Sequence, residues 1–176
     1  MLYDKHGLIV IGYQGIGKTT TTINHNKKCI DLESSAFKID GKRYPDWSTV
    51  YAKQAVKLAC QGHIVFVSSH KCVREAIANL GYLDCGILYC YPICNMKKKW
   101  IKRLRKRYEK DKSEKNFIAW KDALENFDEE ITSLENDIHC DGRFVIWDTD
   151  YDLWKTLKRL CSIYSIKLTP IDMRSK

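Results

Sequence analysis

No uninterrupted apolar run in this sequence approaches the length of a membrane span, which takes about 20 residues. The sequence has no internal repeat and no low-complexity linker, and it begins without the charged and apolar regions of a secretory signal peptide. These absences argue against a membrane-spanning protein, a repeat array and a secreted protein. We therefore expect a cytoplasmic protein with no membrane partner, as a monomer or a homodimer.

The eight cysteines lack the paired CxxC spacing of a metal or redox motif. Several lie inside apolar patterns of strands or helices, where a free cysteine behaves as a small buried hydrophobic residue. We therefore predict free thiols rather than a disulfide framework. The less favoured alternative is a zinc site that combines Cys90 and Cys94 with His139 or Cys140.

The length of 176 residues suits one α/β domain, so we expect residues 1–176 to form a single domain. The net charge is +8, and it is unevenly distributed, with a dense basic run at 97–112 and an acidic stretch at 122–141. Such asymmetry favours a local anion site over a surface that coats nucleic acid.

The most informative stretch is 8–22, which reads LIVIGYQGIGKTTTT. After an apolar run, residues 12–19 fill every position of the phosphate-binding pattern GxxxxGK followed by Ser or Thr. A chance match in a chain of this length is expected in roughly one sequence in a hundred or fewer. The stretch therefore predicts binding of a nucleoside triphosphate.

Each residue type in this pattern has a physical role. The apolar run predicts a buried parallel strand, and the glycines let successive amide N–H groups point at one anion. Lys18 supplies a positive charge, and Thr19 offers a hydroxyl to Mg²⁺ in the first turn of a helix whose N-terminus favours anions. The predicted ATP-binding residues are Gly12, Gln14, Gly15, Ile16, Gly17, Lys18, Thr19 and Thr20.

Acidic residues follow the second predicted strand, 28–32. Asp31 and Glu33 lie at its carboxyl end, the edge where parallel α/β sheets bind ligands, so we expect at least one of them to face the nucleotide. The alternative is that they only cap the next segment. The third predicted strand, 63–67, ends in Ser68, Ser69 and His70 without the acid of a motor or switch ATPase. That absence moves the metal and base roles to Asp31 or Glu33, with Asp31 as the predicted metal ligand beside Thr19.

Segment 36–61 is the predicted acceptor-binding region. Residues 37–47 contain a DG turn and a proline, which predicts an ordered excursion rather than a strand, and 47–61 has the periodicity of an amphipathic helix. Arg43 beside Tyr44 and Trp47 suits a pocket that grips a phosphate and stacks a base, although aromatic residues at a helix start also simply pack. Ser68 and His70, at the edge of a central strand, complete the predicted acceptor site.

Segment 93–139 is predicted to form a helical lid. The fourth strand, 86–91, is expected to stop at Pro92, and a helix at 95–110 then carries Arg103 and Arg107 one turn apart on one face. Two such guanidinium groups can bracket a phosphate chain and stay charged during phosphoryl transfer. A second helix at 117–136 would complete the hairpin, followed by a fifth strand at 143–147 and a last helix at 151–162. The tail from Lys167 carries no signal that predicts structure.

This arrangement resembles the P-loop kinases of nucleoside monophosphates. The resemblance is specific at 12–19, and the segment with Tyr91, Pro92 and the helix carrying Arg103 and Arg107 looks like the lid entry of guanylate-kinase-like enzymes. Asp31 and Glu33 stand where related small-molecule kinases carry a DxD motif, with Glu in place of the second Asp. The stretches CIDLESSAF, IVFVSSHK and DGKRYPDW are also similar to small bacteriophage kinases.

The resemblance implies a three-layer α/β fold, the P-loop NTPase fold, with a five-stranded parallel sheet of order 2-3-1-4-5 and an arginine-rich helical lid. It also implies ATP and Mg²⁺ as cofactors and transfer of the γ-phosphoryl group to a nucleotide. The catalytic residues it implies are Lys18, Asp31, Glu33, Arg103 and Arg107, and a phage origin would imply the host cytoplasm as location. Two alternatives stay open: a polynucleotide 5′-hydroxyl kinase, and a module that senses ATP or binds nucleic acid without turnover.

Overall fold

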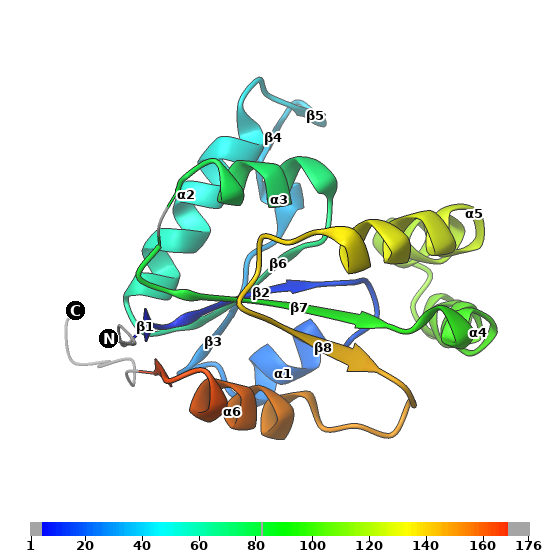
Figure 1. Cartoon of the computed structure of the whole chain (residues 1–176). Helices are drawn as coiled ribbons and strands as arrows, with labels where there is room; N and C mark the ends of the chain where they lie inside the picture. Colours follow the sequence, from blue (N-terminus) through cyan, green and yellow to red (C-terminus); the bar gives the residue numbers. More distant parts are fainter. Residues whose placement is uncertain (1–4, 82, 169–176) are drawn as a thin grey trace.

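The computed structural model describes residues 5–81 and 83–168, and a five-stranded parallel sheet lies at its centre (Figure 1). The order across the sheet is β3-β6-β2-β7-β8. Taken along the chain, these are the second, third, first, fourth and fifth of the five strands, so the mixed α/β class with a parallel sheet is confirmed. The strands are β2 (Leu8–Gly12), β3 (Cys29–Asp31), β6 (Ile64–Ser68), β7 (Gly86–Pro92) and β8 (Gly142–Ile146).

The central strand β2 is buried over its whole length, as expected for a parallel strand with helices on both faces. Its neighbours run in register, so Gly12 lies opposite Ser68 of β6 and Cys90 of β7. The carboxyl ends of these strands therefore form one edge, and the phosphate loop leaves the sheet from the middle of that edge.

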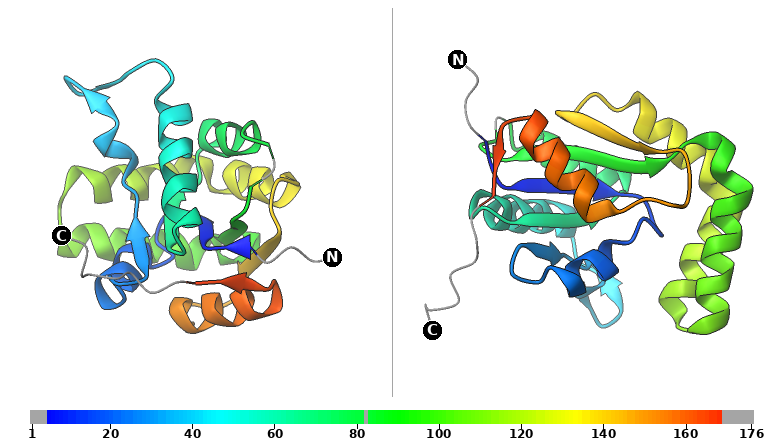
Figure 2. Two further views of the ribbon diagram at one scale, coloured as in Figure 1. Left: turned by 90° about the vertical axis from the view of Figure 1, so that its left-hand side faces the viewer. Right: turned by 90° about the horizontal axis from the view of Figure 1, so that it is seen from below.

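Helices cover both faces of the sheet and extend past its carboxyl edge (Figures 1 and 2). One face carries α2 (Trp47–Cys60) and α3 (Lys71–Ala78), and the other carries α1 (Lys18–Asn24) and α6 (Leu153–Ile163). The helices α4 (Lys97–Lys110) and α5 (Glu114–Asn136) pack against each other beyond the strand ends. Short 3₁₀ turns at Ser34–Ala36 and Cys94–Met96 lead out of β3 and into α4.

Segment 37–47 differs from its prediction, because it contains a short antiparallel hairpin of β4 (Lys38–Ile39) and β5 (Lys42–Arg43). The turn residues Asp40 and Gly41 have φ values of 51° and 76°, and two successive positive φ values are typical of a two-residue hairpin turn. The prediction that this excursion contains no strand is therefore wrong. Figure 2 shows the hairpin extending away from the body of the protein.

Two further details differ from the sequence prediction. Pro92 is the last residue of β7 rather than the residue that stops the strand before it. A parallel pair of two-residue strands, β1 (Lys5–His6) and β9 (Ile166–Lys167), joins the two ends of the described chain, and β9 lies where the sequence carries no structural signal.

A buried arginine connects α3 to the end of α5. Arg74 donates hydrogen bonds to the carbonyl oxygens of Ser69 and Ser133, each at 3.2 Å, and forms an ion pair with Asp137. Its side chain is only 4% exposed. The loop that carries Ser68 to His70 is thereby tied to the base of the α4–α5 hairpin.

All eight cysteines are free thiols, and Cys29, Cys85, Cys90 and Cys161 are buried. Within residues 5–81 and 83–168, no three or more His, Cys, Asp or Glu side chains gather in a way that could hold a metal ion. None of the helices in the described ranges is both long enough and apolar enough to span a bilayer.

Candidate active site

A cleft with a volume of about 960 Å³ lies at the carboxyl edge of the sheet, between the phosphate loop, the end of β3, the β4–β5 hairpin and the α4–α5 hairpin. It brings together most of the site residues that the sequence predicts. Those that line it are Gln14, Gly15, Gly17, Lys18, Thr19, Thr20, Asp31, Glu33, Arg43, Ser68, His70, Arg103 and Arg107.

Four predicted site residues do not line this cleft. Gly12 is the buried last residue of β2, and Ile16 is 1% exposed in the core beneath the loop. Trp47 lies under the guanidinium of Arg43, whose central carbon is 3.6 Å from the ring centroid. Tyr44 is half-buried in the turn that precedes α2.

The phosphate loop depends on glycine where its backbone turns left-handed. Gly15 has φ +84° and Gly17 has φ +101°, and a residue with a Cβ is strained in that region. A Cβ on Gly15 would also lie 2.9 Å from Leu104 of α4. The loop is therefore both tightly curved and closely covered by the hairpin.

Lys18 bridges the ends of two strands. Its Nζ donates to the carbonyl oxygen of Gly12 at 2.7 Å and approaches that of Val67 at 3.5 Å. Burial lowers the pKa of this amine from its ordinary value, while the nearby Asp31 and Glu33 carboxylates act in the opposite direction. The ammonium thus lies at the floor of the cleft with carboxylates on one side.

Thr19 and Asp31 meet beside the loop. The Thr19 hydroxyl donates to Asp31 Oδ2 at 2.8 Å, across the gap between the start of α1 and the end of β3. A hydroxyl and a carboxylate are hard oxygen donors of the kind that Mg²⁺ prefers, so this pair fits a magnesium ion that also binds phosphate oxygens.

Glu33 reaches across the cleft instead of capping the next turn. It stands at the N-cap of the 3₁₀ turn, but its side chain makes no capping hydrogen bond. It forms an ion pair with Lys115, near the start of α5. The tip of the α4–α5 hairpin is therefore linked to the end of β3 over the mouth of the cleft.

Three contacts hold the phosphate loop from outside. The indole of Trp100 donates to the carbonyl oxygen of Gln14 at 2.8 Å, and the amide of Gln14 donates to Asp122 at 3.0 Å. Tyr151 donates its hydroxyl to the carbonyl oxygen of Ile16 at 2.8 Å. Both helices of the hairpin therefore contact the loop through the same residue, Gln14.

A carboxyl group with an altered pKa lies behind Gln14. Burial and then the charge of Asp122 raise the pKa of Glu130 to about 7. Among the described residues, neither Glu130 Oε2 nor the Tyr13 hydroxyl has a hydrogen-bond partner in the structure, and both atoms are buried. A proton on Glu130 near neutral pH lowers the negative charge on this wall of the cleft.

Arg43 adds a positive charge to the lining of the cleft. Arg43 Nη2 donates to the Ser34 hydroxyl at 3.4 Å, and the guanidinium stacks on Trp47. Its Nη1 is buried and makes no hydrogen bond within the described parts of the chain. Desolvation, followed by the charges of Arg43 and Lys18, lowers the pKa of His70 from its ordinary value, so this ring is neutral at pH 7.

The two arginines of α4 both face the cleft. Arg103 is half-buried, with its guanidinium 5.1 Å from the ring centroid of Trp100 and 5.7 Å from that of Tyr151. Arg107 is exposed one turn further along the helix. The pair thus lines the side of the cleft that adjoins the phosphate loop.

Sequence reasoning missed several residues of this site, namely Trp100, Lys115, Asp122, Glu130 and Tyr151. Lys115 and Asp122 have charged neighbours in the sequence, so their spacing carries no distinguishing signal. Trp100 does carry one, because it is a large apolar residue that directly follows three lysines in a basic run. An aromatic residue at that position indicates a buried contact.

The sequence matches no family model and no curated protein. Solved structures resemble it in fold. Shikimate kinase from Bacteroides thetaiotaomicron has a TM-score of 0.53 at 15% identity, covering 89% of this chain and 96% of its own. The SH3-kinase fragment of tight junction protein 3 has a TM-score of 0.50 at 11% identity, and the match covers 94% of this chain but 59% of that fragment. At such low identity the likeness concerns the fold alone, and that fold is one found in kinases.

Proposed function

We propose that this protein is a phosphotransferase that moves the γ-phosphoryl group of ATP to a nucleotide, with a (deoxy)nucleoside monophosphate as acceptor and Mg²⁺ as the metal. The observation that carries the proposal is the cleft itself. It is lined both by a complete phosphate-binding loop and by Arg43, a half-buried cation whose Nη1 makes no hydrogen bond within the described chain. Two cationic groups in one cleft of about 960 Å³ support the binding of two anions.

In this proposal the loop 12–19 binds the β and γ phosphates of ATP through its amide N–H groups, and Lys18 turns its ammonium from the Gly12 carbonyl to the phosphates. Thr19 and Asp31, whose side chains are hydrogen-bonded to each other, would supply oxygen ligands to the metal. When bound, the ion neutralises charge on the transferring phosphates. Asp31, with Glu33 close by, also orients the attacking oxygen of the acceptor.

Segment 36–61 would bind the acceptor. Arg43 offers its free N–H to the acceptor's phosphate, and its stacking on Trp47 fixes the plane of the guanidinium. Ser68 and a neutral His70 line the adjoining wall and provide hydrogen-bonding groups without adding charge. In the proposal, Tyr44 and Trp47 border the acceptor's base once the hairpin moves inward.

Segment 93–139 would act as the lid. Arg103 and Arg107 approach the transferring group from α4 and stabilise its charge. Closure would also exclude water, which otherwise competes with the acceptor. The contacts of Trp100 and Asp122 with Gln14 would make the phosphate loop sensitive to the position of the hairpin.

A transfer screen from γ-labelled ATP with Mg²⁺ tests the proposal, with all ribo- and deoxynucleoside monophosphates, nucleosides and a 5′-hydroxyl oligonucleotide offered in parallel. The expected result is label on a mononucleotide, which is lost in Lys18→Ala and Asp31→Asn and retained in Glu75→Gln, an exposed control on α3. Label on the oligonucleotide alone would overturn the acceptor assignment. Bound ATP with no labelled product would overturn the enzymatic proposal.

A further inference from the structure

One segment, consisting of α4 and the two residues that follow it, has the same net charge as the whole protein. Segment 97–112 contains ten Lys and Arg residues and two acidic residues, a net charge of +8, which equals the net charge of the entire chain. Positive and negative side chains in the rest of the chain are therefore equal in number, counting histidine as neutral. In Figure 1 the helix concerned, α4, lies at the outer side of the protein, beyond the carboxyl edge of the sheet.

The positive side chains of α4 form two groups, one that lines the cleft and one that does not. Trp100 and Leu104 are buried, and Arg103 and Arg107 line the cleft. Helical spacing then places a row of exposed lysines beside these arginines, outside the cleft lining, at intervals of three or four residues. This row, the lysine stripe, consists of Lys99, Lys102, Lys106 and Lys110.

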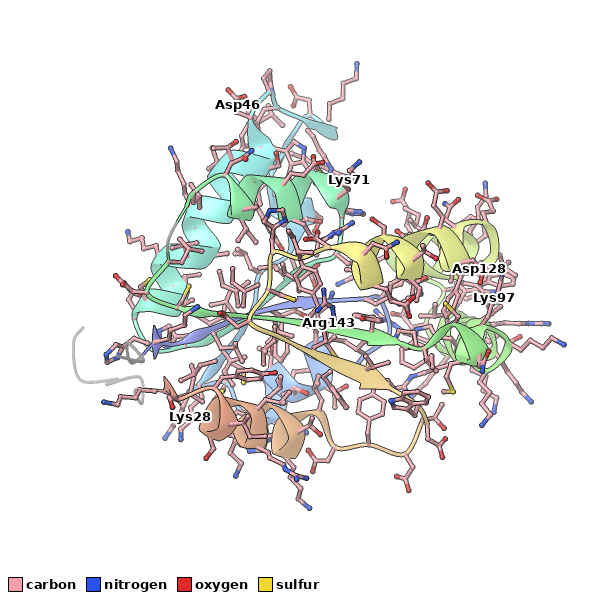
Figure 3. All side chains as sticks on the ribbon, viewed as in Figure 1. Lys28, Asp46, Lys71, Lys97, Asp128 and Arg143 are labelled. Carbon is pink, nitrogen blue, oxygen red and sulfur yellow. The ribbon has the colours of Figure 1, made fainter. Side chains whose placement is uncertain are left out.

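The stripe has no counter-charge of its own. The ion pairs of α4 in the described structure are Arg105 with Glu109 on the same helix and Lys97 with Asp128 of α5, and neither involves the stripe. Figure 3 shows Lys97 and Asp128 together between the two helices, while other nitrogen-tipped side chains of α4 extend outward. The four ammonium groups therefore face solvent, free to meet an external anion.

Such an arrangement costs stability. Like charges at helical neighbour positions repel by about 0.2–0.5 kcal/mol per pair, and the stripe contains three successive pairs. The first turn of α4 adds lysines at 97, 98 and 99 with no acidic residue, where the helix dipole disfavours positive charge. Neighbouring α5 instead mixes both signs, for example in the pair of Lys121 and Glu125. A surface that only keeps the protein soluble has no need of this one-sided charge.

We propose that the lysine stripe binds the phosphate backbone of a nucleic acid, without sequence preference. The stripe spans about 16 Å along the helix, which is enough for several successive phosphates of one strand. It contains only lysines, which act as point charges, and it lacks the planar groups that read base edges. This inference does not depend on phosphoryl transfer, because none of the four lysines of the stripe lines the cleft.

Other anionic partners fit the stripe less well. Exposed acids of α5 could pair with the stripe of a second copy, but Glu125 and Asp128 already have lysine partners within their own chain. An anionic lipid surface would be favoured by apolar residues beside the lysines that enter the bilayer. The exposed stripe offers none, since its helical neighbours on the outer face are Lys98, Arg105 and Glu109.

Fluorescence anisotropy with a labelled 20-nucleotide DNA of mixed sequence, single-stranded and as a duplex, tests the proposal over a range of salt concentrations. We expect a plot of the logarithm of the association constant against the logarithm of the salt concentration to have a slope of about −3, as four phosphate contacts require. The variant Lys102→Gln/Lys106→Gln should weaken binding about tenfold at moderate salt and reduce the slope by about half. Gln keeps the helix propensity of Lys, so helix content should not change.

The matched control is Lys53→Gln/Lys57→Gln, which removes two exposed charges at the same spacing from α2. This control should bind DNA like the wild type. Equal losses of DNA affinity in both variants would show that only the net charge of the protein matters, and would overturn the proposal that the lysine stripe is the binding site.

Three further results would also contradict the proposal. The first is displacement of the DNA by saturating ATP and Mg²⁺, which would indicate that the DNA binds in the cleft. The second is binding to phosphatidylserine vesicles but to neither form of DNA. The third is self-association that Lys102→Gln/Lys106→Gln abolishes, in a protein that does not bind DNA. Retained DNA binding in Lys18→Ala, with phosphoryl transfer lost, would support the stripe and separate it from the proposed enzymatic site.

Discussion

At the scale of single residues, the two oxygen atoms of Thr19 and Asp31 carry much of the proposed chemistry. They belong to different elements, and the 2.8 Å hydrogen bond between them brings a hydroxyl and a carboxylate to the edge of the phosphate loop. The Thr19 side chain is exposed in the cleft rather than packed in the core. Its hydroxyl can therefore be removed without disturbing the fold.

Thr19→Val replaces this hydroxyl by a methyl group of similar size. We predict a fall in kcat of about a hundredfold at saturating ATP and Mg²⁺, because the variant lacks the oxygen that would help to hold the metal in the proposed mechanism. Thr19→Ser restores the hydroxyl and should retain most of the activity. Steady-state kinetics of the three proteins provide the comparison, and equal kcat values for Val and Ser would exclude a metal-binding role for Thr19.

Glu130 makes stability depend on pH in a direction opposite to that of most carboxyl groups. Burial and Asp122 raise its pKa to about 7, so the folded state holds this proton more tightly than the unfolded chain does. Its stabilising contribution is fully present below the ordinary pKa near 4.5 and is lost as pH rises through about 7.

Glu130→Gln mimics the protonated acid at every pH. We predict that it leaves stability nearly unchanged at acidic pH and raises it relative to wild type by on the order of 1 kcal/mol above pH 7, since solvent screens part of the effect. Urea denaturation at both pH values measures the difference. The exposed neighbour Glu129→Gln is the control. Parallel pH profiles for Glu130→Gln and the wild type would show that this carboxyl does not titrate as described.

At the scale of elements, the α4–α5 hairpin is held by buried contacts at its base and by an exposed ion pair at its tip. Its base contacts the phosphate loop through the buried Trp100 and Leu104. Its tip is linked to β3 by Lys115 and Glu33, and both side chains are more than 40% exposed. Exposed ion pairs contribute about 0–1 kcal/mol, so any lid motion should occur at the tip.

Two tryptophans of this hairpin allow a matched test of its base. Trp100→Phe keeps a ring but leaves the Gln14 carbonyl oxygen without its donor, and we predict a loss of about 1–2 kcal/mol in stability and a several-fold rise in the Kd for ATP. The indole N–H of Trp120 is buried and has no partner in the described chain. Trp120→Phe should therefore be neutral or slightly stabilising by urea denaturation. Equal losses in both variants would show that the Gln14 contact contributes nothing.

At the scale of the whole molecule, periodicity and the phosphate-loop pattern predict the mixed α/β class and the parallel sheet. They also predict which residues gather at its carboxyl edge. Asp31, Ser68 and Arg103 come from three separate segments and line one cleft with Lys18, because the carboxyl ends of parallel strands share an edge.

The remaining features depend on contacts between distant segments. The strands β1 and β9 have two residues each, too few for an alternating pattern. Hydrogen bonds of Trp100 and Tyr151 with the phosphate loop join residues 86 and 135 positions apart. No local pattern in the sequence indicates such pairs. The β4–β5 hairpin is different, because its Asp40-Gly41 turn is visible in the sequence and is typical of a two-residue hairpin turn.

The buried Arg74 connects the loop after β6 to the end of α5, and substitution of this residue tests how much that connection stabilises the fold. Arg74→Leu would remove the guanidinium that pairs with the half-buried carboxylate of Asp137 and leave the carbonyl oxygens of Ser69 and Ser133 without this donor, and we predict a loss of about 3–5 kcal/mol in the free energy of unfolding. Arg105→Leu, which breaks the exposed pair with Glu109, should cost less than about 1 kcal/mol. Urea denaturation of both variants decides the question, and similar losses would contradict a structural role for the buried pair.

The central claim is that the cleft delivers a phosphoryl group to an anionic acceptor rather than to water. Single-turnover reaction with γ-labelled ATP, Mg²⁺ and the mononucleotide identified by the transfer screen tests it directly, because the label then divides between acceptor and inorganic phosphate. We predict that most of the label reaches the mononucleotide and that Asp31→Asn abolishes the transfer. Label that appears only in inorganic phosphate, at a rate independent of the mononucleotide, would contradict the account.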